Sequence, residues 1–469
     1  MSVMPAGWTT TTLGDVALEV RNGISTKPNE DSGLPILRIS AVRAMKLDAS
    51  DVRYLPADFP NAGTYALRTD DLLFTRYNGN RDLVGACARA AAVAAGLTYP
   101  DKLIRVRLDT RVALPAFVEA AACAQGARDF IDQQLKTSAG QVGVSGADLK
   151  RLPLPLAPLA EQQRIADKLD AVVARVDACR DRLARVASLL KRFRQAVLSA
   201  ATSGRLSADW RDLRSEASAT TPARSPLVIY ADEQDELPAG WSWRQLVELA
   251  RLESGHTPRK SVAAYWDGGD VPWISLQDIR AADGRVVTET KFRPTQAGID
   301  NSSARLLPEG TVCFCRDISF GYVTIMGRPM ATSQHFANWV CTPQLLPKYL
   351  MYAFMAARRF LGMSGQGTTV TTIYMPALKE LRLATPTAEE QAEIVRRVGL
   401  LFAFADRLEA RLAKAQAAAD RLTPALLAKA FRGELVPQDP ADEPAAELLK
   451  RLTADGPAPA AKVRRPRAV

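Results

Sequence analysis

The chain has 469 residues, a formal net charge of +10 and 47% hydrophobic residues. This length allows about three domains with sizeable cores. No apolar run is long enough to span a membrane, and the first residues lack the basic start and apolar stretch of a signal peptide, so we expect a cytoplasmic protein. The six cysteines form no disulfide-like framework, and the positive charge favours a polyanionic partner.

Residues 1–155 read as one mixed domain with short strand-like runs. A long helix follows over 156–206, with Pro158 just before its start and Gly204 after its end. Between Glu161 and Leu206 there are ten Lys or Arg residues against five Asp or Glu residues, which is either a basic binding face or an ordinary solvated helix face.

The rest of the chain repeats this plan. Residues 207–236 are rich in small residues and read as a linker. A second mixed domain covers 237–385, and a second long helix covers 386–436. The remainder, 437–469, is rich in Pro, Ala and acidic residues and ends in a basic stretch, so we expect a disordered basic tail.

The two long helices are copies of each other at a constant offset. Glu161-Gln162-Gln163-Arg164-Ile165 aligns without a gap on Glu390-Gln391-Ala392-Glu393-Ile394, and Gly204 aligns on Gly433. The mixed domains are also related, with small insertions: both open on Pro-Ala-Gly-Trp, and Asp71–Arg76 aligns on Thr311–Arg316. A duplicated chain can present two similar surfaces to a ligand that has two sites along its length.

Apolar residues in both helices recur at alternating spacings of four and three. This spacing is typical of a coiled-coil seam rather than a broad globular face. It runs from Ile165 to Val197 in the first helix and from Ile394 to Leu426 in the second. Two such seams in one chain most simply pack on each other, the alternative being that each helix packs on its own domain.

Motifs for catalysis are missing. The chain has no Gly-x-x-x-x-Gly-Lys-Ser/Thr phosphate loop, no Gly-x-Gly-x-x-Gly fingerprint after a strand and only two histidines. Cys313, Cys315, His335 and Cys341 match no standard zinc spacing, and we expect no metal site.

The layout resembles the DNA-specificity subunit of a type I restriction–modification system. The resemblance rests on Glu-Gln-x-x-Ile at each helix start, on the helix ends Phe193–Leu206 and Leu426–Leu435, and on the Pro-x-Gly-Trp starts. It covers nearly all of residues 5–436. The second motif departs from the first, since Ala392-Glu393 replaces Gln163-Arg164.

The resemblance implies an α+β fold: two similar target-recognition domains, joined and spaced by two long helices that form an antiparallel coiled coil with a pseudo-two-fold internal repeat. It implies a non-catalytic reader of a bipartite site in double-stranded DNA. The partners would be two adenine methyltransferase subunits, contacted through the helix-start motifs, and ATP-dependent restriction subunits. Adenosylmethionine, ATP and Mg would belong to those partners. The helix-motif residues are Glu161, Gln162, Ile165, Glu390, Gln391 and Ile394.

The residues that would touch DNA must combine base-edge donors and acceptors with phosphate contacts. Candidates for base reading are Arg38, Arg76, Asn78 and Arg81 in the first domain, and Ser275, Gln277, Arg316 and Asp317 in the second. Candidates for phosphate binding are Lys27, Arg259 and Lys260, on Gly-led loops. Candidates for either role are Ser138, Gln141, Ser364 and Gln366, in Gly/Ser loops.

Three other functions stay open at this point. One is a specificity subunit that serves a fused restriction–methylation enzyme of another type, which would have much the same sequence. The others are a structural scaffold without a nucleic-acid role and an enzyme in its own right. The target sequence and the gap length cannot be read from the chain.

Overall fold

The computed structural model describes residues 4–138, 141–214, 225–228, 237–364 and 372–454. The chain divides into two compact units, Met1–Leu183 with Lys414–Val469, and Ala184–Ala413. Each unit contains one mixed domain and parts of both long helices, α6 (Leu159–Thr202) and α13 (Ala388–Ala430). The expected α+β fold with an internal repeat is confirmed.

The first domain is built around a four-stranded antiparallel sheet of order β2-β10-β7-β9, with a β1–β13 pair beside the helix start. Its strands are β1 (Thr9–Thr12), β2 (Ala17–Asn22), β3 (Leu34–Leu37), β4 (Val42–Arg43), β5 (Lys46–Leu47), β6 (Val52–Leu55), β7 (Leu72–Thr75), β8 (Tyr77–Asn78), β9 (Cys87–Arg89), β10 (Leu103–Leu108), β11 (Lys136–Ser138), β12 (Gln141–Gly143) and β13 (Pro153–Leu156). Its helices are α1 (Leu13–Val16), α2 (Ala62–Tyr65), α3 (Pro115–Ala122), α4 (Gln125–Gln134) and α5 (Gly146–Lys150).

The second domain repeats this sheet and adds a strand, giving the order β16-β22-β19-β20-β18. Its strands are β14 (Leu227–Val228), β15 (Ser242–Gln245), β16 (Ala250–Ser254), β17 (Trp273–Ile274), β18 (Val286–Val287), β19 (Val312–Cys315), β20 (Val323–Met326), β21 (Ala331–Thr332), β22 (Phe336–Cys341) and β23 (Arg382–Thr385). Its helices are α8 (Leu246–Leu249), α9 (Leu276–Ala281), α10 (Gln296–Asp300), α11 (Pro347–Ser364) and α12 (Met375–Lys379), and α7 (Ala208–Asp212) precedes it.

The predicted linker at 207–236 needs correction where the structure describes it. Helix α7 follows α6 after a short 3-10 helix, Arg205–Ser207, and β14 pairs with β23, so Leu227 and Val228 extend a sheet of the second domain. Both residues are buried, and this burial of apolar side chains stabilises the strand.

The predicted disordered tail at 437–469 is also corrected in part. Helix α14 covers Ala445–Ala454; Ala445 is buried in the core of the first domain, and Leu448 is also buried. Asp442 forms an ion pair with Arg164 on α6 (2.6 Å), and Ala445 N donates to Gly7 O (2.9 Å). Residues 455–469 lie outside the described residues.

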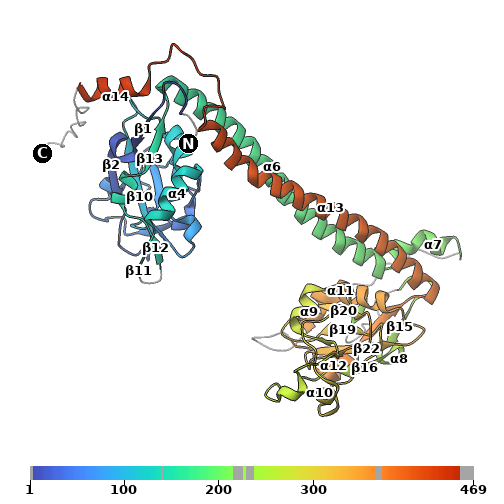
Figure 1. The fold of residues 1–469 in the computed structure, drawn as a ribbon. Coiled ribbons are helices and arrows are strands. Elements are labelled where there is room, and N and C mark those ends of the chain that lie inside the picture. Colours follow the sequence, from blue (N-terminus) through green and yellow to red (C-terminus); the bar gives the residue numbers. More distant parts are fainter. Residues whose placement is uncertain (1–3, 139–140, 215–224, 229–236, 365–371, 455–469) are drawn as a thin grey trace. The chain divides into compact units, whose positions relative to one another are not determined.

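Helices α6 and α13 run side by side and antiparallel (Figure 1). In the first unit Arg180 of α6 forms an ion pair with Asp420 of α13 (3.4 Å), and in the second unit Arg194 forms one with Glu409 (3.0 Å). The expected packing of the two seams on each other is therefore confirmed.

The seam is not buried along its whole length. Val176, Leu190 and Ala405 are buried, whereas Val186 and Leu422 are 39% and 47% exposed. A straight α-helix rotates by about 20° per heptad relative to a strict seven-residue repeat, so parts of a seam turn away from the partner helix.

Each helix end enters the core of the domain that precedes the other helix. Val197, Leu198 and Ala201 of α6 belong to the second domain's core, while Leu427 and Ala430 of α13 belong to the first.

A glycine follows each of these helix ends and packs closely against the start of the domain that the helix end enters. Gly204 has φ +74° and Gly433 has φ +71°. A Cβ atom at Gly204 would lie 2.6 Å from Pro238, and one at Gly433 would lie 2.7 Å from Pro5. Each Pro opens a Pro-Ala-Gly-Trp motif, so the sequence repeat becomes a repeated junction between helix end and domain start.

Candidate nucleic-acid interface

Arg76 and Arg316 occupy equivalent positions in the two domains. Each follows the last residue of the strand in the middle of its sheet, β7 or β19. Arg76 N donates to Lys102 O (2.8 Å), and Arg316 N donates to His335 O (3.0 Å). On the other side, Val144 N donates to Arg76 O and Ile373 N to Arg316 O, both at 3.0 Å. Equivalent backbone hydrogen bonds therefore fix the positions of both arginines in their domains.

The two guanidinium groups are also held alike. Arg76 Nη1 donates to Asp101 O (3.3 Å), and Arg316 Nη2 donates to Gln334 O (3.2 Å). The Arg76 guanidinium lies over the Tyr77 ring, 4.6 Å from its centroid. Both side chains are half-buried. Each is positioned by the segment before the neighbouring strand of the sheet, which is 99–102 before β10 in the first domain and 332–335 before β22 in the second.

The Gly-led loops lie against these same segments. A Cβ atom at Gly23 would lie 2.2 Å from Pro100 O, and one at Gly255 would lie 2.2 Å from Ser333 O. Only glycine fits such a close approach to backbone. The loops bring the three phosphate candidates Lys27, Arg259 and Lys260 to the edge of the sheet as exposed side chains.

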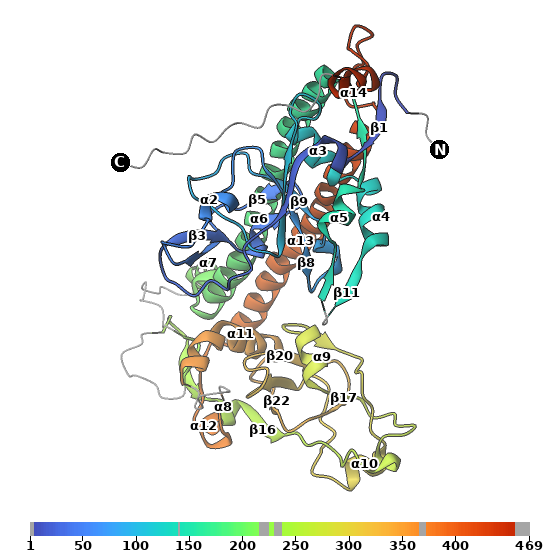
Figure 2. The same ribbon diagram turned by 90° about the vertical axis from the view of Figure 1, so that its left-hand side faces the viewer.

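The remaining candidates of the first domain form two groups. Asn78 lies in β8, which pairs with β12, and β12 pairs with β11 through Ser138 and Gln141, so these three positions share one small sheet. Figure 2 labels β8 and β11 of this sheet, and Arg76 immediately precedes β8 in the chain. Asn78 Oδ1 accepts from Asn80 N (2.9 Å) and so also shapes the following turn.

Arg38 and Arg81 do not share that sheet. Arg38 follows β3 and forms an ion pair with Asp51 (3.5 Å), whereas Arg81 reaches Asp132 of α4 (3.6 Å). Both are exposed, so these pairs are weak and leave the guanidinium groups accessible.

In the second domain, Ser275 has a structural task. Its hydroxyl accepts from Gln277 N (3.2 Å) and Asp278 N (3.4 Å) as the N-cap of α9. Gln277 is exposed, and its Oε1 accepts from Lys291 Nζ (2.9 Å). Asp317 accepts from His335 Nδ1 (2.8 Å). The side chain of Ser364 is not described, and Gln366 lies outside the described residues.

One cleft of about 320 Å³ brings several of these residues together. The candidates Lys260, Ser275 and Gln277 line it, as do Gln334 and His335, which sequence reasoning missed as reading positions. In the structure they correspond to Asp101 and Lys102, whose carbonyl groups accept hydrogen bonds from Arg76 in the first domain.

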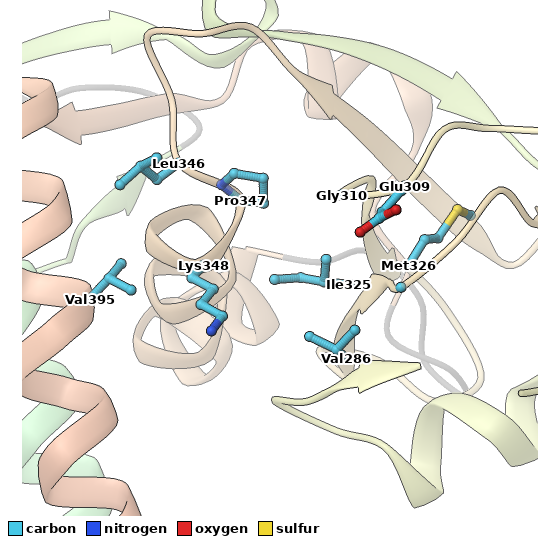
Figure 3. Close-up of a pocket in the computed structure, with 10 residues that line it drawn as sticks. Val286, Glu309, Gly310, Ile325, Met326, Leu346, Pro347, Lys348 and Val395 are labelled. Carbon is cyan, nitrogen blue, oxygen red and sulfur yellow. The ribbon is translucent and has the colours of Figure 1, made fainter. Parts of the chain in front are cut away.

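A second cavity of the same domain has a different character. It measures about 310 Å³ and lies between β18, β20, the start of α11 and Val395 of α13 (Figure 3). Apart from Glu309 and Lys348, its side chains are apolar. It therefore offers few groups that could read a base edge.

The helix-start motifs are buried inside the chain. Trp8 Nε1 donates to Glu161 Oε2 (3.0 Å), and Trp241 Nε1 donates to Glu390 Oε2 (2.9 Å). Burial raises the pKa of Glu161 against the opposing hydrogen bond from Trp8. Ile165 and Ile394 are fully buried in the two cores.

The adjacent glutamines each form three hydrogen bonds. Gln162 Oε1 accepts from Leu114 N (2.9 Å), and its Nε2 donates to Val112 O (3.0 Å) and Ala157 O (2.9 Å). Gln391 repeats the pattern: Oε1 accepts from Leu346 N (2.8 Å), and Nε2 donates to Gln344 O and Pro386 O. The motif thus fixes each domain to its helix, and contact of these residues with a partner subunit stays a prediction.

Within the described ranges, no group of three or more His, Cys, Asp or Glu side chains is arranged to hold a metal ion. Burial raises the pKa of the Cys315 thiol to about 11 and that of Cys341 to about 12. No helix of the described part is long and apolar enough to cross a membrane.

Comparisons with known proteins agree with this geometry. Residues 238–415 match the family model "Type I restriction modification DNA specificity domain". The chain is 26% identical over 486 residues to the type I restriction enzyme StySPI specificity subunit of Salmonella potsdam, which covers 96% of both proteins. It is 39% identical over 198 residues to the EcoKI specificity subunit of Escherichia coli K12, a match that spans 42% of each chain.

The fold is also found among solved structures. A chain described under "Structural basis underlying complex assembly and conformational transition of the type I R-M system" aligns with a TM-score of 0.69 at 20% identity, covering 92% of this chain and 99% of that one. Over 96% of its length the chain is therefore similar to a type I restriction enzyme specificity subunit, and residues 238–415 match the family model of the DNA specificity domain.

Proposed function

We propose that this chain is the non-catalytic subunit that selects the DNA target of a type I restriction–modification enzyme, and that each domain reads one half of a bipartite site. The proposal rests on the equivalent backbone hydrogen bonds that position Arg76 in the first domain and Arg316 in the second. The residues whose carbonyl oxygens accept hydrogen bonds from these arginines differ between the domains. They are Asp101 and Lys102 in the first domain and Gln334 and His335 in the second. Two domains that share a backbone geometry but differ in the side chains it carries are suited to recognise two different half-sites.

Catalysis is assigned to partner subunits in this proposal. Two adenine methyltransferase subunits would dock on the chain and bind adenosylmethionine, and the target adenine would be flipped into their pockets. Restriction subunits would bind ATP and Mg. The basic surplus along α6 would support phosphate binding near the DNA, and the complex would work in the cytoplasm.

A reconstitution experiment tests this division of labour. The purified full chain should transfer no methyl group from adenosylmethionine to DNA. Sequence-specific adenine methylation should appear when the cognate methyltransferase subunit is added, and the methyltransferase alone should not reproduce the target choice. Methyl transfer by the verified pure chain would overturn the proposal.

A further inference from the structure

The polar rim of the second domain's cleft consists mainly of hydrogen-bond donors. Gln277 Oε1 accepts from Lys291 Nζ (2.9 Å), and an ammonium group can only donate, so this contact fixes which end of the Gln277 carboxamide is the oxygen. Gln334 Oε1 accepts from the Thr257 hydroxyl (2.5 Å). Both carboxamide oxygens therefore have a partner inside the domain. The two NH₂ groups point away from these partners, and they can only donate hydrogen bonds.

Three acceptors around the cleft, on Ser275, Asp278 and Asp317, are already used inside the domain, whereas Ser333 Oγ is buried without a hydrogen-bond partner. Ser275 Oγ accepts two backbone N–H groups at the start of α9. Asp278 Oδ2 accepts from Ser275 N and Ser275 Oγ, and its Oδ1 accepts from Lys291 N (3.0 Å). The Asp317 carboxylate accepts from His335. The rim of the cleft therefore adds the Lys260 ammonium to the two amide donors and offers few acceptors.

His335 supplies the one ring acceptor. A carboxylate can only accept, so Nδ1 carries a hydrogen that faces Asp317. In the tautomer of the neutral ring that has this hydrogen, the other ring nitrogen, Nε2, is an acceptor. His335 is half-buried and lines the same cleft as Gln277 and Gln334.

An aromatic wall borders these polar groups. Trp273 is buried and Phe292 is 40% exposed, and their rings meet edge to face with centroids 6.3 Å apart. Trp273 Nε1 is engaged with His256 O (3.1 Å), so the wall contributes apolar surface to the cleft. Apolar surface beside donors excludes water and makes their hydrogen bonds more discriminating.

Base pairs differ in what they present in the major groove. Guanine shows two neighbouring acceptors, N7 and O6, and the paired cytosine shows the N4 amino donor. Adenine places a donor, N6, next to its N7 acceptor, so it needs an acceptor where this cleft offers the amide donors. Thymine has a single acceptor, O4, beside its methyl group. Two amide donors with one imidazole acceptor complement the G·C pair.

We infer that the cleft formed by Thr257, Gln277, Gln334 and His335 reads a G·C pair in the half-site of the second domain, with the glutamine amides donating to guanine N7 and O6. This inference rests on the proposed function, because it needs DNA bound at this edge of the sheet. It goes beyond that function in naming the base pair and the residues that select it.

The test uses the full chain reconstituted with its methyltransferase. First, the methylated target is determined from a randomised duplex library, and its two halves are assigned by the effects of Gln334→Ala and Gln277→Ala. We expect a G·C pair in the half-site whose recognition these variants relax. At that position discrimination should fall by about 5- to 150-fold, the range for one lost base contact, while the other half-site is read unchanged.

Replacing the guanine at that position by 7-deazaguanine removes only the N7 acceptor. The wild-type complex should lose affinity for this duplex, and at least one of the two glutamine variants should be insensitive to the change. The matched control is Gln296→Ala, an exposed glutamine of the same domain whose amide bonds Asp300 (2.7 Å) and which does not line the cleft. It should behave as wild type in every assay.

The outcomes separate two failures. If the wild-type complex methylates without a split target, the proposed function fails. If the split target exists but neither half-site changes in the two glutamine variants, if the relaxed position is not a G·C pair, or if 7-deazaguanine affects wild type and both variants equally, the cleft assignment is wrong and the function stands. Uniform weakening on all sequences would mean phosphate contact and would also overturn the assignment.

Discussion

Gln162 gives the clearest test of how each domain is fixed to its helix. Its carboxamide is fully buried and forms three hydrogen bonds, to Leu114 N, Val112 O and Ala157 O. The substitution Gln162→Ala leaves three backbone groups without these partners. Each buried group left unsatisfied costs about 1–3 kcal/mol, so even the lower limit gives about 3 kcal/mol for the three.

This loss translates into a measurable shift in melting temperature. For a folded unit of 150–250 residues, 1 kcal/mol corresponds to about 2–4 °C. The transition of the first unit should therefore fall by about 6–12 °C in differential scanning calorimetry. Gln391→Ala should lower the transition of the second unit by a similar amount, because Gln391 repeats the three contacts. Amide exchange at Leu114 should accelerate in the first variant and at Leu346 in the second.

The neighbouring glutamine is the matched control. Gln163 lies in the same motif but is exposed, and its amide bonds only Asp167 (2.8 Å). Gln163→Ala should change stability by no more than about 0.5 kcal/mol. Equal melting temperatures for the Gln162 and Gln163 variants would refute the reasoning. Loss of methyltransferase binding by Gln162→Ala without loss of stability would instead favour the motif as a partner contact.

Three further predictions follow from the same structure. Arg76→Ala should relax recognition of one half-site and Arg316→Ala the other, at about 1–3 kcal/mol each, in methylation assays on single-base target variants; equal weakening on random DNA would show that the arginine is no base reader. Inserting one heptad into both helices, after Leu183 and after the facing Gln416, adds about 10 Å, or about three base pairs. The protein should stay folded but lose tight binding to its native split target in an equilibrium binding assay, and unchanged affinity would show that the helices do not set the gap. Hydrogen bonds from Arg396 and Arg397 lower the pKa of Glu393 to about 2, so its contribution to stability is complete above about pH 4.5 and is lost as pH falls towards 2. Glu393→Gln should abolish that part of the pH dependence in urea unfolding, and an unchanged profile would contradict it.

The repeat made much of the fold predictable from the sequence. The constant offset between the helices located both helix starts, and Glu-Gln is buried at each. The structure also explains why the second motif tolerates a departure. Positions 163 and 392 are both exposed, so Gln163 and Ala392 are equally acceptable there, whereas the buried Glu and Gln are kept in both copies.

Other features depended on tertiary contacts that the sequence does not display. The acidic, Pro-rich composition after Pro437 concealed α14, whose apolar residues Leu449 and Leu452 pack on the first domain's core. The seam spacing predicted pairing but not the local turning of Val186 and Leu422 away from the partner helix.

The positions of the candidate DNA-contacting residues were only partly predictable. The pairing of Arg76 with Arg316 follows from strand alignment, and their shared backbone frame agrees with it. Ser275 looked like a base reader, although Ser275 and Asp278 form a capping box that the spacing already signals. Gln334 and His335 were missed because insertions between the domains hide their alignment with Asp101 and Lys102.

Mapping adenine methylation by single-molecule sequencing tests the central claim most directly. The DNA would come from cells that express this chain with its methyltransferase, compared with cells that express the methyltransferase alone. We expect a split motif with two specific halves and a fixed gap, present only with this chain, in which Arg316→Ala degrades one half and leaves the other intact. A continuous motif, or the same methylation in cells without the chain, would contradict the account of two domains that each read half of the target.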